Sequence, residues 1–153
     1  MKTLSVLGAL ALCLIVMPES AVAQDDDGPE YRYITTSTFH VPMGPERQKV
    51  MTFIRNVMAP QAKVNPNILS FRVALHDYGT DSRDIVLIRE YASWEAIDAD
   101  CGKPCDDYWD ANPRPEDGTA EQQAWREAWQ AFRDHYAQHS DEIYRVNMDL
   151  AKY

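Results

Sequence analysis

Cys101 and Cys105 form the pair of residues in this sequence with the widest choice of chemistry. Gly102 and Pro104 stand between them and favour a tight turn that would bring the two sulfur atoms together. Such a pair can form a disulfide, bind copper or zinc through thiolates, or cycle as a redox couple. The usual redox motif has one residue fewer between its cysteines. We therefore favour a local disulfide, which would stabilise the fold by about 2 kcal/mol.

Two histidines, His135 and His139, lie four residues apart in a segment with helical periodicity. Histidines at this spacing share one side of a helix and can bind the same metal ion, with Glu142 or the segment around the cysteines as a source of further ligands. We favour a role in packing or hydrogen bonding, and so predict no metal site. A metal-handling protein that uses Cys101, Cys105, His135 and His139 is kept as an alternative.

Aromatic side chains share one stripe of this predicted helix, which opens with the capping sequence Thr119-Ala120-Glu121-Gln122. Such a stripe either fills a core or lines a pocket for a planar ligand. The candidate ligand-binding residues are therefore Trp125, Trp129, Phe132 and Tyr136.

Charged side chains interrupt two otherwise apolar predicted strands. Arg72, Arg89 and Glu90 must be paired or must reach a pocket, an interface or solvent, because an unpaired charge is costly to bury. We expect a structural ion pair, with an anchor for an acidic ligand as the alternative. His40 and His76 lie at strand ends, where a histidine can act as a general base at a pocket mouth or can simply be exposed.

The composition argues against several classes of function. The chain has 24 Asp and Glu residues against 15 Lys and Arg residues, a net charge of −9. Nucleic acids and anionic membranes attract basic surfaces, so we expect neither as a partner. The sequence has no Gly-x-Ser-x-Gly nucleophile motif and no Gly-x-Gly-x-x-Gly dinucleotide motif.

The first 23 residues have the organisation of an export signal. Lys2 precedes an apolar run from Leu4 to Met17 and the small-residue exit Ala21-Val22-Ala23. Cleavage after Ala23 would leave about 130 residues, one ordinary domain, in a periplasmic or secreted compartment that permits disulfides. We therefore expect a signal peptide at residues 1–23, an acidic tail at 24–30 and a folded domain at 31–153.

Alternating and helical patterns divide this domain into elements. Strands are expected at residues 31–40, 68–76, 84–91 and 142–153. The two main helices begin at Pro45 and Thr119, Pro60 ends or kinks the first of them, and Ser93 caps a short additional helix. Residues 100–118, with three prolines, are expected to form an irregular, solvated insertion that the cysteines hold at its base.

The order strand, helix, strand, strand, helix, strand predicts a ferredoxin-like, split βαβ fold of the α+β class with an antiparallel sheet. The short polar loop at residues 77–83 predicts a hairpin between the second and third strands. Both faces of the first strand mix polar and apolar side chains, which suits a sheet covered on both sides.

Three runs of the sequence carry a family resemblance. They are Asn65-Pro66-Asn67-Ile68-Leu69-Ser70-Phe71-Arg72-Val73, Asp84-Ile85-Val86-Leu87-Ile88-Arg89-Glu90-Tyr91 and Ser93-Trp94-Glu95-Ala96-Ile97. With them the chain resembles the dimeric α/β-barrel superfamily, and most of all its antibiotic biosynthesis monooxygenase type. The resemblance implies a homodimer that pairs two sheets face to face, with a pocket between sheet and helices in each subunit.

The resemblance also implies a range of activities. The family includes cofactor-independent oxygenases and haem-degrading enzymes, and its pockets commonly use an Asn, a Trp and an aromatic residue or His. Trp94 lies near the place of that tryptophan, whereas Asp98 and Asp100 stand where many members have a histidine. Because the chain has no counterpart of the haem-ligating histidine, we expect no cofactor.

Together these features predict an exported small-molecule-binding or monooxygenase-like protein that acts on an aromatic or organic ligand. The catalytic candidates are His76, Arg89, Tyr91 and Trp94. A cofactor-free oxygenase would need a base and an oxyanion partner among them. A non-catalytic structural or stress-related dimer is a second hypothesis, and the sequence leaves open whether the protein is an enzyme.

Overall fold

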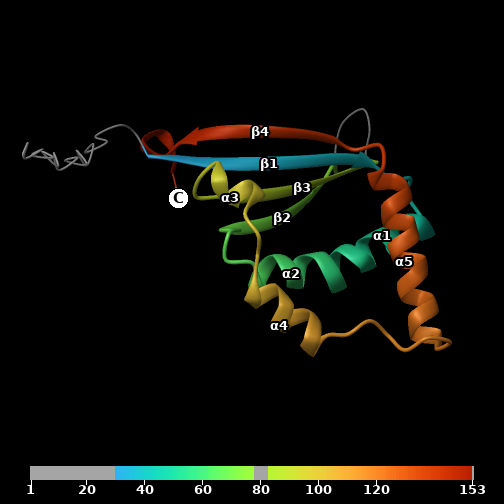
Figure 1. The fold of residues 1–153 in the computed structure, drawn as a ribbon. Helices are drawn as coiled ribbons and strands as arrows, with labels where there is room; N and C mark the ends of the chain where they lie inside the picture. Colours follow the sequence, from blue (N-terminus) through green and yellow to red (C-terminus); the bar gives the residue numbers. More distant parts are fainter. Residues whose placement is uncertain (1–29, 78–82, 153) are drawn as a thin grey trace, which may run out of the picture.

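The computed structural model describes residues 30–77 and 83–152 (Figure 1). The expected signal peptide and residues 24–29 of the expected tail lie outside the described residues. The elements are β1 (Tyr31–His40), α1 (Pro45–Phe53), the π-helical turn η1 (Ile54–Met58), α2 (Ala59–Val64), β2 (Ser70–Leu75), β3 (Asp84–Tyr91), α3 (Glu95–Asp98), α4 (Lys103–Ala111), α5 (Ala120–Tyr136), β4 (Ser140–Asn147) and the short 3₁₀ turn η2 (Met148–Leu150).

The four strands form one antiparallel sheet in the order β2-β3-β1-β4. In β1, Phe39 pairs with Ile85 of β3, and Thr36 pairs with Glu142 of β4. β2 and β3 are antiparallel neighbours, as the predicted hairpin requires. This strand order, with one main helix before β2 and another before β4, is that of the ferredoxin-like α+β fold, so the predicted fold class is confirmed.

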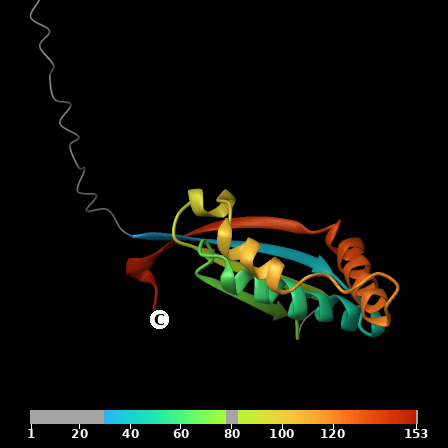
Figure 2. The ribbon, with the colours of Figure 1, turned by 60° about the horizontal axis from the view of Figure 1, so that its bottom comes forward.

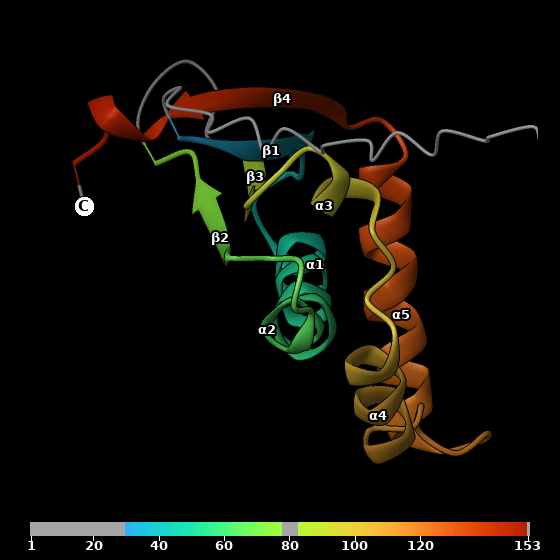
Figure 3. The same cartoon turned by 60° about the vertical axis from the view of Figure 1, so that its left-hand side comes forward.

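The helices lie on one face of the sheet (Figures 1 and 3). Phe39, Ile85 and Leu87 point toward that side and are almost fully buried. The opposite face, which we call the open face, presents Arg32, Ile34, Thr36, Arg72, Ala74, Val86, Ile88, Glu90, Glu142 and Tyr144. No helix in the described part of the chain covers the open face, so the cover expected on both sides is present on only one.

The first helical segment runs past Pro60 without ending. The segment passes from α1 through η1 into α2 and stops at Val64. Pro60 lies in the first turn of α2, where its missing N–H and fixed φ are tolerated. The π-helical turn just before it changes the backbone hydrogen bonding, so the helical segment does not end at Pro60, which was the first of the two outcomes that the sequence suggests.

The closing strand is shorter than the sequence pattern suggests. β4 begins two residues early, at Ser140, and ends at Asn147 rather than running on to Tyr153. The Asn147 side chain accepts a hydrogen bond of 2.9 Å from the N–H of Asp149, which turns the chain into η2. A short polar side chain that captures the backbone therefore ends this strand.

The insertion at residues 100–118 is partly helical, contrary to the expected irregular loop. α4 begins after Gly102, whose φ of 60° suits glycine, and Pro104 lies in its first turn. Lys103 and Asp107, four residues apart, form an ion pair on its exposed side. α4 packs against α2 on the side away from the sheet (Figures 1 and 2). The prolines therefore mark the boundaries of a helix.

The hydrophobic core lies between the sheet and the pair α1 and α5. Its buried members are Phe39, Val41, Val50, Phe53, Ile54, Ile85, Leu87, Ala128, Ala131 and Phe132. Within the described ranges, no helix combines the length and the apolar character that crossing a membrane requires.

Candidate functional site

A cavity of about 660 Å³ opens between the first helical segment, the insertion and α5. This volume falls in the range of roughly 300–1,000 Å³ that small-molecule sites occupy. The cavity is lined by Phe53, Val57, Gln61, Trp109, Pro113, Arg114, Trp125 and Trp129. We call it the aromatic cavity, because four of these eight side chains are aromatic and none of the eight comes from the sheet.

α5 supplies one wall of the aromatic cavity. The helix begins where Thr119 Oγ1 accepts a hydrogen bond of 3.1 Å from the N–H of Gln122, as the capping sequence predicts. Trp125 and Trp129, one turn apart, stack with 6.4 Å between ring centroids and 23° between ring planes. Phe53 of α1 meets Trp129 at 5.1 Å. The wall is thus a run of rings whose faces suit a flat apolar ligand.

The insertion supplies the opposite wall, which is not among the sequence-based predictions. Trp109 comes from α4, and Pro113 and Arg114 come from the loop between α4 and α5. The guanidinium carbon of Arg114 lies 5.4 Å from the centroid of the Trp125 ring, in cation–π geometry. Cys105 and Trp109 are four residues apart, and this helical spacing is a signal that could have revealed α4.

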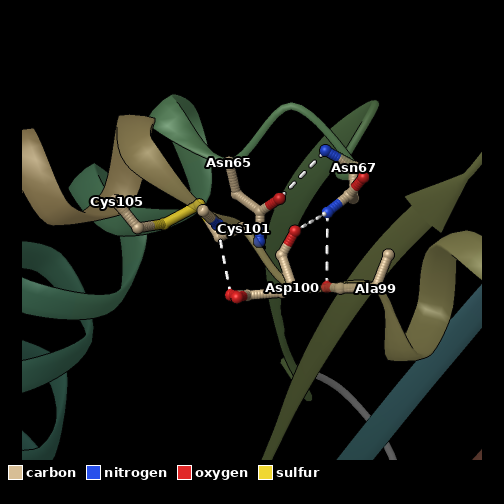
Figure 4. Close-up of a disulfide and its surroundings, with 7 residues drawn as sticks. Asn65, Asn67, Ala99, Asp100, Cys101 and Cys105 are labelled. Atoms are coloured by element: carbon tan, nitrogen blue, oxygen red, sulfur yellow. Dashed lines mark hydrogen bonds between the residues drawn. A yellow bond between two sulfur atoms is a disulfide. The ribbon is translucent and has the colours of Figure 1, made fainter.

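A disulfide between Cys101 and Cys105 fixes the start of α4, as predicted (Figure 4). Next to it, the side-chain amide of Asn67 donates hydrogen bonds to the carbonyl oxygens of Ala99 at 3.3 Å and Asp100 at 3.0 Å (Figure 4). Asp100 in turn accepts one of 3.1 Å from the N–H of Gly102. The disulfide and these three hydrogen bonds therefore hold the start of the insertion in place.

The other two aromatic candidates on α5 lie in the core. Phe132 is buried and meets Phe39 edge-to-face at 5.9 Å. Tyr136 packs on Phe39 at 5.5 Å, and its hydroxyl donates to Ser37 Oγ at 3.3 Å. The stripe thus divides along its length, with Trp125 and Trp129 at the cavity and the later two rings against the sheet.

A second, smaller cavity of about 220 Å³ lies between α2 and the sheet. It is lined by Met58, Gln61, Ala62, Asn65, Ile68, Phe71, Arg89 and Tyr91. Two of the four catalytic candidates, Arg89 and Tyr91, therefore share this cavity. Gln61 borders both cavities, since its side chain lies on α2 between them. No pattern in the sequence singles out Gln61.

The remaining catalytic candidates lie elsewhere. Trp94 packs edge-to-face on Tyr33 at 5.8 Å and is half exposed. His76 follows the end of β2 farthest from Arg89, roughly 16 Å along the strand from Phe71, which is opposite Arg89. There Asp84 lies between His76, at 3.7 Å, and His40. The structure therefore does not gather the four candidates into one site.

Among the described residues, those of the metal-handling alternative do not gather into one group of possible ligands. The disulfide engages both cysteines, so neither offers a thiolate. His139 stacks on Tyr136 and contacts Asp141 through Nε2 at 2.8 Å. Within residues 30–77 and 83–152, no three His, Cys, Asp or Glu side chains gather in a way that could hold a metal ion.

The strand charges form the expected ion pair, and Arg32 of β1 is an additional partner in it. On the open face, Glu90 is buried and accepts hydrogen bonds of 3.0 Å from both Arg32 and Ser70. Arg72 lies 3.7 Å away from it. Arg89 points to the other face and lies over the Phe71 ring. Burial raises the pKa of Glu90, the hydrogen bonds and the arginine charges lower it, and the net result is a pKa below the ordinary value of 4.5.

No protein-family model matches the sequence, and no curated protein matches it. Several solved structures are similar to the chain in shape. A proposed antibiotic biosynthesis monooxygenase from Bacillus cereus is 18% identical, with a TM-score of 0.41 over 80% of this chain and 98% of that one. A mutant of SnoaB, a cofactor-independent oxygenase from Streptomyces nogalater, is 13% identical, with a TM-score of 0.38 over 75% and 90%.

A third similar structure is a dimeric protein of unknown function with a ferredoxin-like fold from Bacteroides fragilis. It is 14% identical, with a TM-score of 0.42 over 74% of this chain and 96% of that one. The neighbours thus include proteins of the type that the sequence resembles. The fold assignment itself rests on element order and strand pairing, by which the chain is a ferredoxin-like α+β protein carrying an inserted, disulfide-fastened helix.

Proposed function

We propose that this protein is a small-molecule-binding, monooxygenase-like protein whose ligand is a planar organic compound held in the aromatic cavity. The observation that carries the proposal is the meeting of Trp109, Trp125, Trp129 and Phe53 around one space of about 660 Å³. Rings offer a large contact area at low entropy cost, and their faces favour flat partners. Proteins rarely leave such surface open without a use for it.

The lining residues favour binding over acid–base catalysis. None of the residues named above for either cavity is a carboxylate or a histidine. General-base catalysis needs a group of suitable pKa within hydrogen-bonding reach of the substrate. In the smaller cavity Arg89 and Tyr91 offer hydrogen-bond donors that could stabilise an oxyanion. Oxygenation of a bound compound is therefore the second candidate function, and it would depend on these two residues.

The tryptophans allow a direct test, because the chain has four and three of them line the aromatic cavity. The indole N–H signals of Trp94, Trp109, Trp125 and Trp129 can be followed by heteronuclear NMR while naphthalenemethanol, a neutral planar compound, is added. We expect saturable shifts for the three cavity tryptophans. Trp94 is a built-in control, since it packs on Tyr33 outside both cavities.

Two results would count against the proposal. Equal shifts of all four signals would indicate non-specific association with the surface. Shifts of Trp94 alone would place the ligand near α3, where the family resemblance rather than the cavity would define the site. For the oxygenase alternative, oxygen consumption with a hydroxylated naphthalene should fall in an Arg89→Gln variant and persist in an Arg133→Gln variant, since Arg133 is exposed on α5.

We further propose that the protein is a homodimer joined through the open face. Several half-buried apolar side chains, among them Ile34, Val86 and Ile88, lie on this face with no cover from the described chain. Around them lie the basic Arg72 and the acidic Glu142, on opposite edge strands. A second copy could bury the apolar centre and pair the two edges.

Export, with cleavage after Ala23, is proposed on the sequence of residues 1–23, and the disulfide is consistent with an oxidising compartment. The mass of the protein from an exporting host should match a chain that begins at Gln24 and has lost two hydrogens at the cysteines. Nucleic acids and membranes are not among the proposed partners, because the net charge of −9 opposes binding to either polyanionic surface.

A further inference from the structure

We propose that the ligand of the aromatic cavity is an aromatic carboxylate, whose ring lies among the tryptophans and whose charge is paired by Arg114. The inference rests on the proposed function and narrows it to one chemical class. It also assigns the insertion a role as the part of the chain that selects this class.

Arg114 is the one charged group among the named lining residues, and it is placed at the rings. Its guanidinium carbon is 5.4 Å from the centroid of Trp125, so its planar group is held over the aromatic wall. A guanidinium in this position keeps its N–H donors available at its edge, where they match the two oxygens of a carboxylate. Gln61 adds an amide that can donate to the same or another polar group.

Among the described residues, Arg114 has no carboxylate partner, although acidic residues flank it in the sequence. Within residues 30–77 and 83–152, no Asp or Glu oxygen lies within ion-pairing distance of Arg114. Asp117, three residues along the same loop, instead faces Arg126 at 3.5 Å. Arg114 is an exposed residue that lines the apolar cavity, and in a chain of net charge −9 this cation beside the rings is where we place the charge of an anionic ligand.

The two side chains that set the proposed specificity, those of Trp109 and Arg114, both belong to the insertion. Trp109 and Arg114 lie on either side of the end of α4, and the disulfide fixes the start of the same helix. A neutral aromatic compound would stack on the tryptophan rings but would leave the Arg114 guanidinium without an anionic partner. An aliphatic acid would satisfy the guanidinium and leave the rings uncovered. An aromatic acid satisfies both.

Titration calorimetry with three probes tests the proposal: naphthoate, naphthalenemethanol and cyclohexanecarboxylate. We expect naphthoate to bind about fivefold more tightly than naphthalenemethanol, the size of effect given by a partly exposed ion pair. Cyclohexanecarboxylate should bind more weakly than either. Arg114→Gln should abolish the preference for naphthoate, and added salt should reduce it in the wild-type protein. Arg133→Gln, an exposed arginine of α5 outside the cavity lining, should leave the preference intact.

The outcomes separate this inference from the proposal on which it rests. If naphthoate and naphthalenemethanol bind equally, or if Arg114→Gln keeps the preference, the carboxylate assignment is wrong while the cavity can still be the site. If Trp109→Leu leaves the binding of both compounds unchanged, the aromatic cavity is not the site and both proposals fail. Trp109 lies outside the hydrophobic core, so this variant should keep its fold, which circular dichroism can verify.

Discussion

Arg32 Nη1 donates a hydrogen bond of 3.0 Å to Glu90 Oε1 across two neighbouring strands, on the face of the sheet that no described helix covers. Glu90 is one of the most buried charged residues of the described chain, with 7% of its surface exposed. A buried carboxylate destabilises a fold unless its hydrogen-bonding partners offset the cost of its burial. The contacts of Glu90 on the open face therefore contribute to the stability of the fold.

The first prediction concerns acid stability. Because the pKa of Glu90 is lowered in the folded state, the charged form stabilises the fold fully above the ordinary value of 4.5, and this contribution is lost as the pH falls through the folded-state pKa. Glu90→Gln should therefore lower the free energy of unfolding by about 2 kcal/mol at neutral pH and flatten its decline below pH 4.5. Urea unfolding at several pH values measures both.

Glu127→Gln is the matched control for this variant. Glu127 is half exposed and pairs with Lys49 at 3.5 Å on the surface between α1 and α5. Such pairs contribute about 0.5 kcal/mol or less. If the two variants showed the same loss and the same pH profile, the account of Glu90 as a buried, partnered carboxylate would be wrong.

The second prediction concerns assembly. Ile88 lies on the open face of β3, opposite Thr36 of β1 and Arg72 of β2. We expect the wild-type protein to be a dimer by analytical ultracentrifugation and Ile88→Asp to be a monomer, because burying a new carboxylate at the apolar centre of the interface costs more in desolvation than its attraction to the neighbouring Arg72 returns. Ala124→Asp places the same charge on an exposed part of α5 and should stay dimeric. A wild-type monomer at micromolar concentration would refute the proposed interface.

A third prediction concerns the disulfide. Replacing Cys101 and Cys105 with serine should lower the free energy of unfolding by about 2 kcal/mol, since the bridge closes a short loop. The same change should weaken aromatic binding, because the entrance to α4, which carries Trp109, loses its covalent link. Asn67→Ala removes the two hydrogen bonds to the carbonyl oxygens of Ala99 and Asp100 while leaving the disulfide intact, and it should also weaken binding.

Thermal unfolding and calorimetry under oxidising and reducing conditions distinguish the two contributions. Reduction should make the wild-type protein behave like the double serine variant and leave that variant unchanged. Reduction that lowers stability but leaves ligand affinity untouched would show that the aromatic cavity does not depend on how α4 is fastened.

Much of the fold could be predicted because its signals are local. β1 follows the alternation of residues 31–40, and α5 begins at the cap formed by Thr119. The insertion defeated the same reasoning, because its prolines and acidic residues suggest a loop while Cys105 and Trp109 lie one helical turn apart. A proline in a sequence can mark a helix break, a kink or a helix start, and only the surrounding packing decides among these.

The candidate site was harder to predict than the fold. Trp125 and Trp129 were identified from their helical stripe, yet the same stripe also contains Phe132, which is a core residue. Trp109 and Arg114 line the same cavity as residues of α1 and α5, an arrangement that no local pattern encodes. The resemblance pointed instead to Trp94, which lies apart from both cavities.

The fourth prediction separates packing from binding with two phenylalanines. Phe53 and Phe132 are equally buried and stack on each other at 5.0 Å, but only Phe53 is among the cavity-lining residues. Each change to leucine should cost about 1 to 2 kcal/mol of stability, measured by urea unfolding. Only Phe53→Leu should also weaken naphthalenemethanol binding. Equal losses of affinity would indicate that binding follows general stability rather than the cavity wall.

The π-helical turn at residues 54–58 changes the direction in which the later side chains of the same helical segment point. Successive residues of an α-helix are about 100° apart around its axis, so one extra residue in a turn rotates everything after it by about that angle. Gln61 comes after this rotation and faces both cavities. Deleting one residue from the turn would restore a regular α-helix. The Gln61 side chain would then point away from both cavities, while α1 would stay in place.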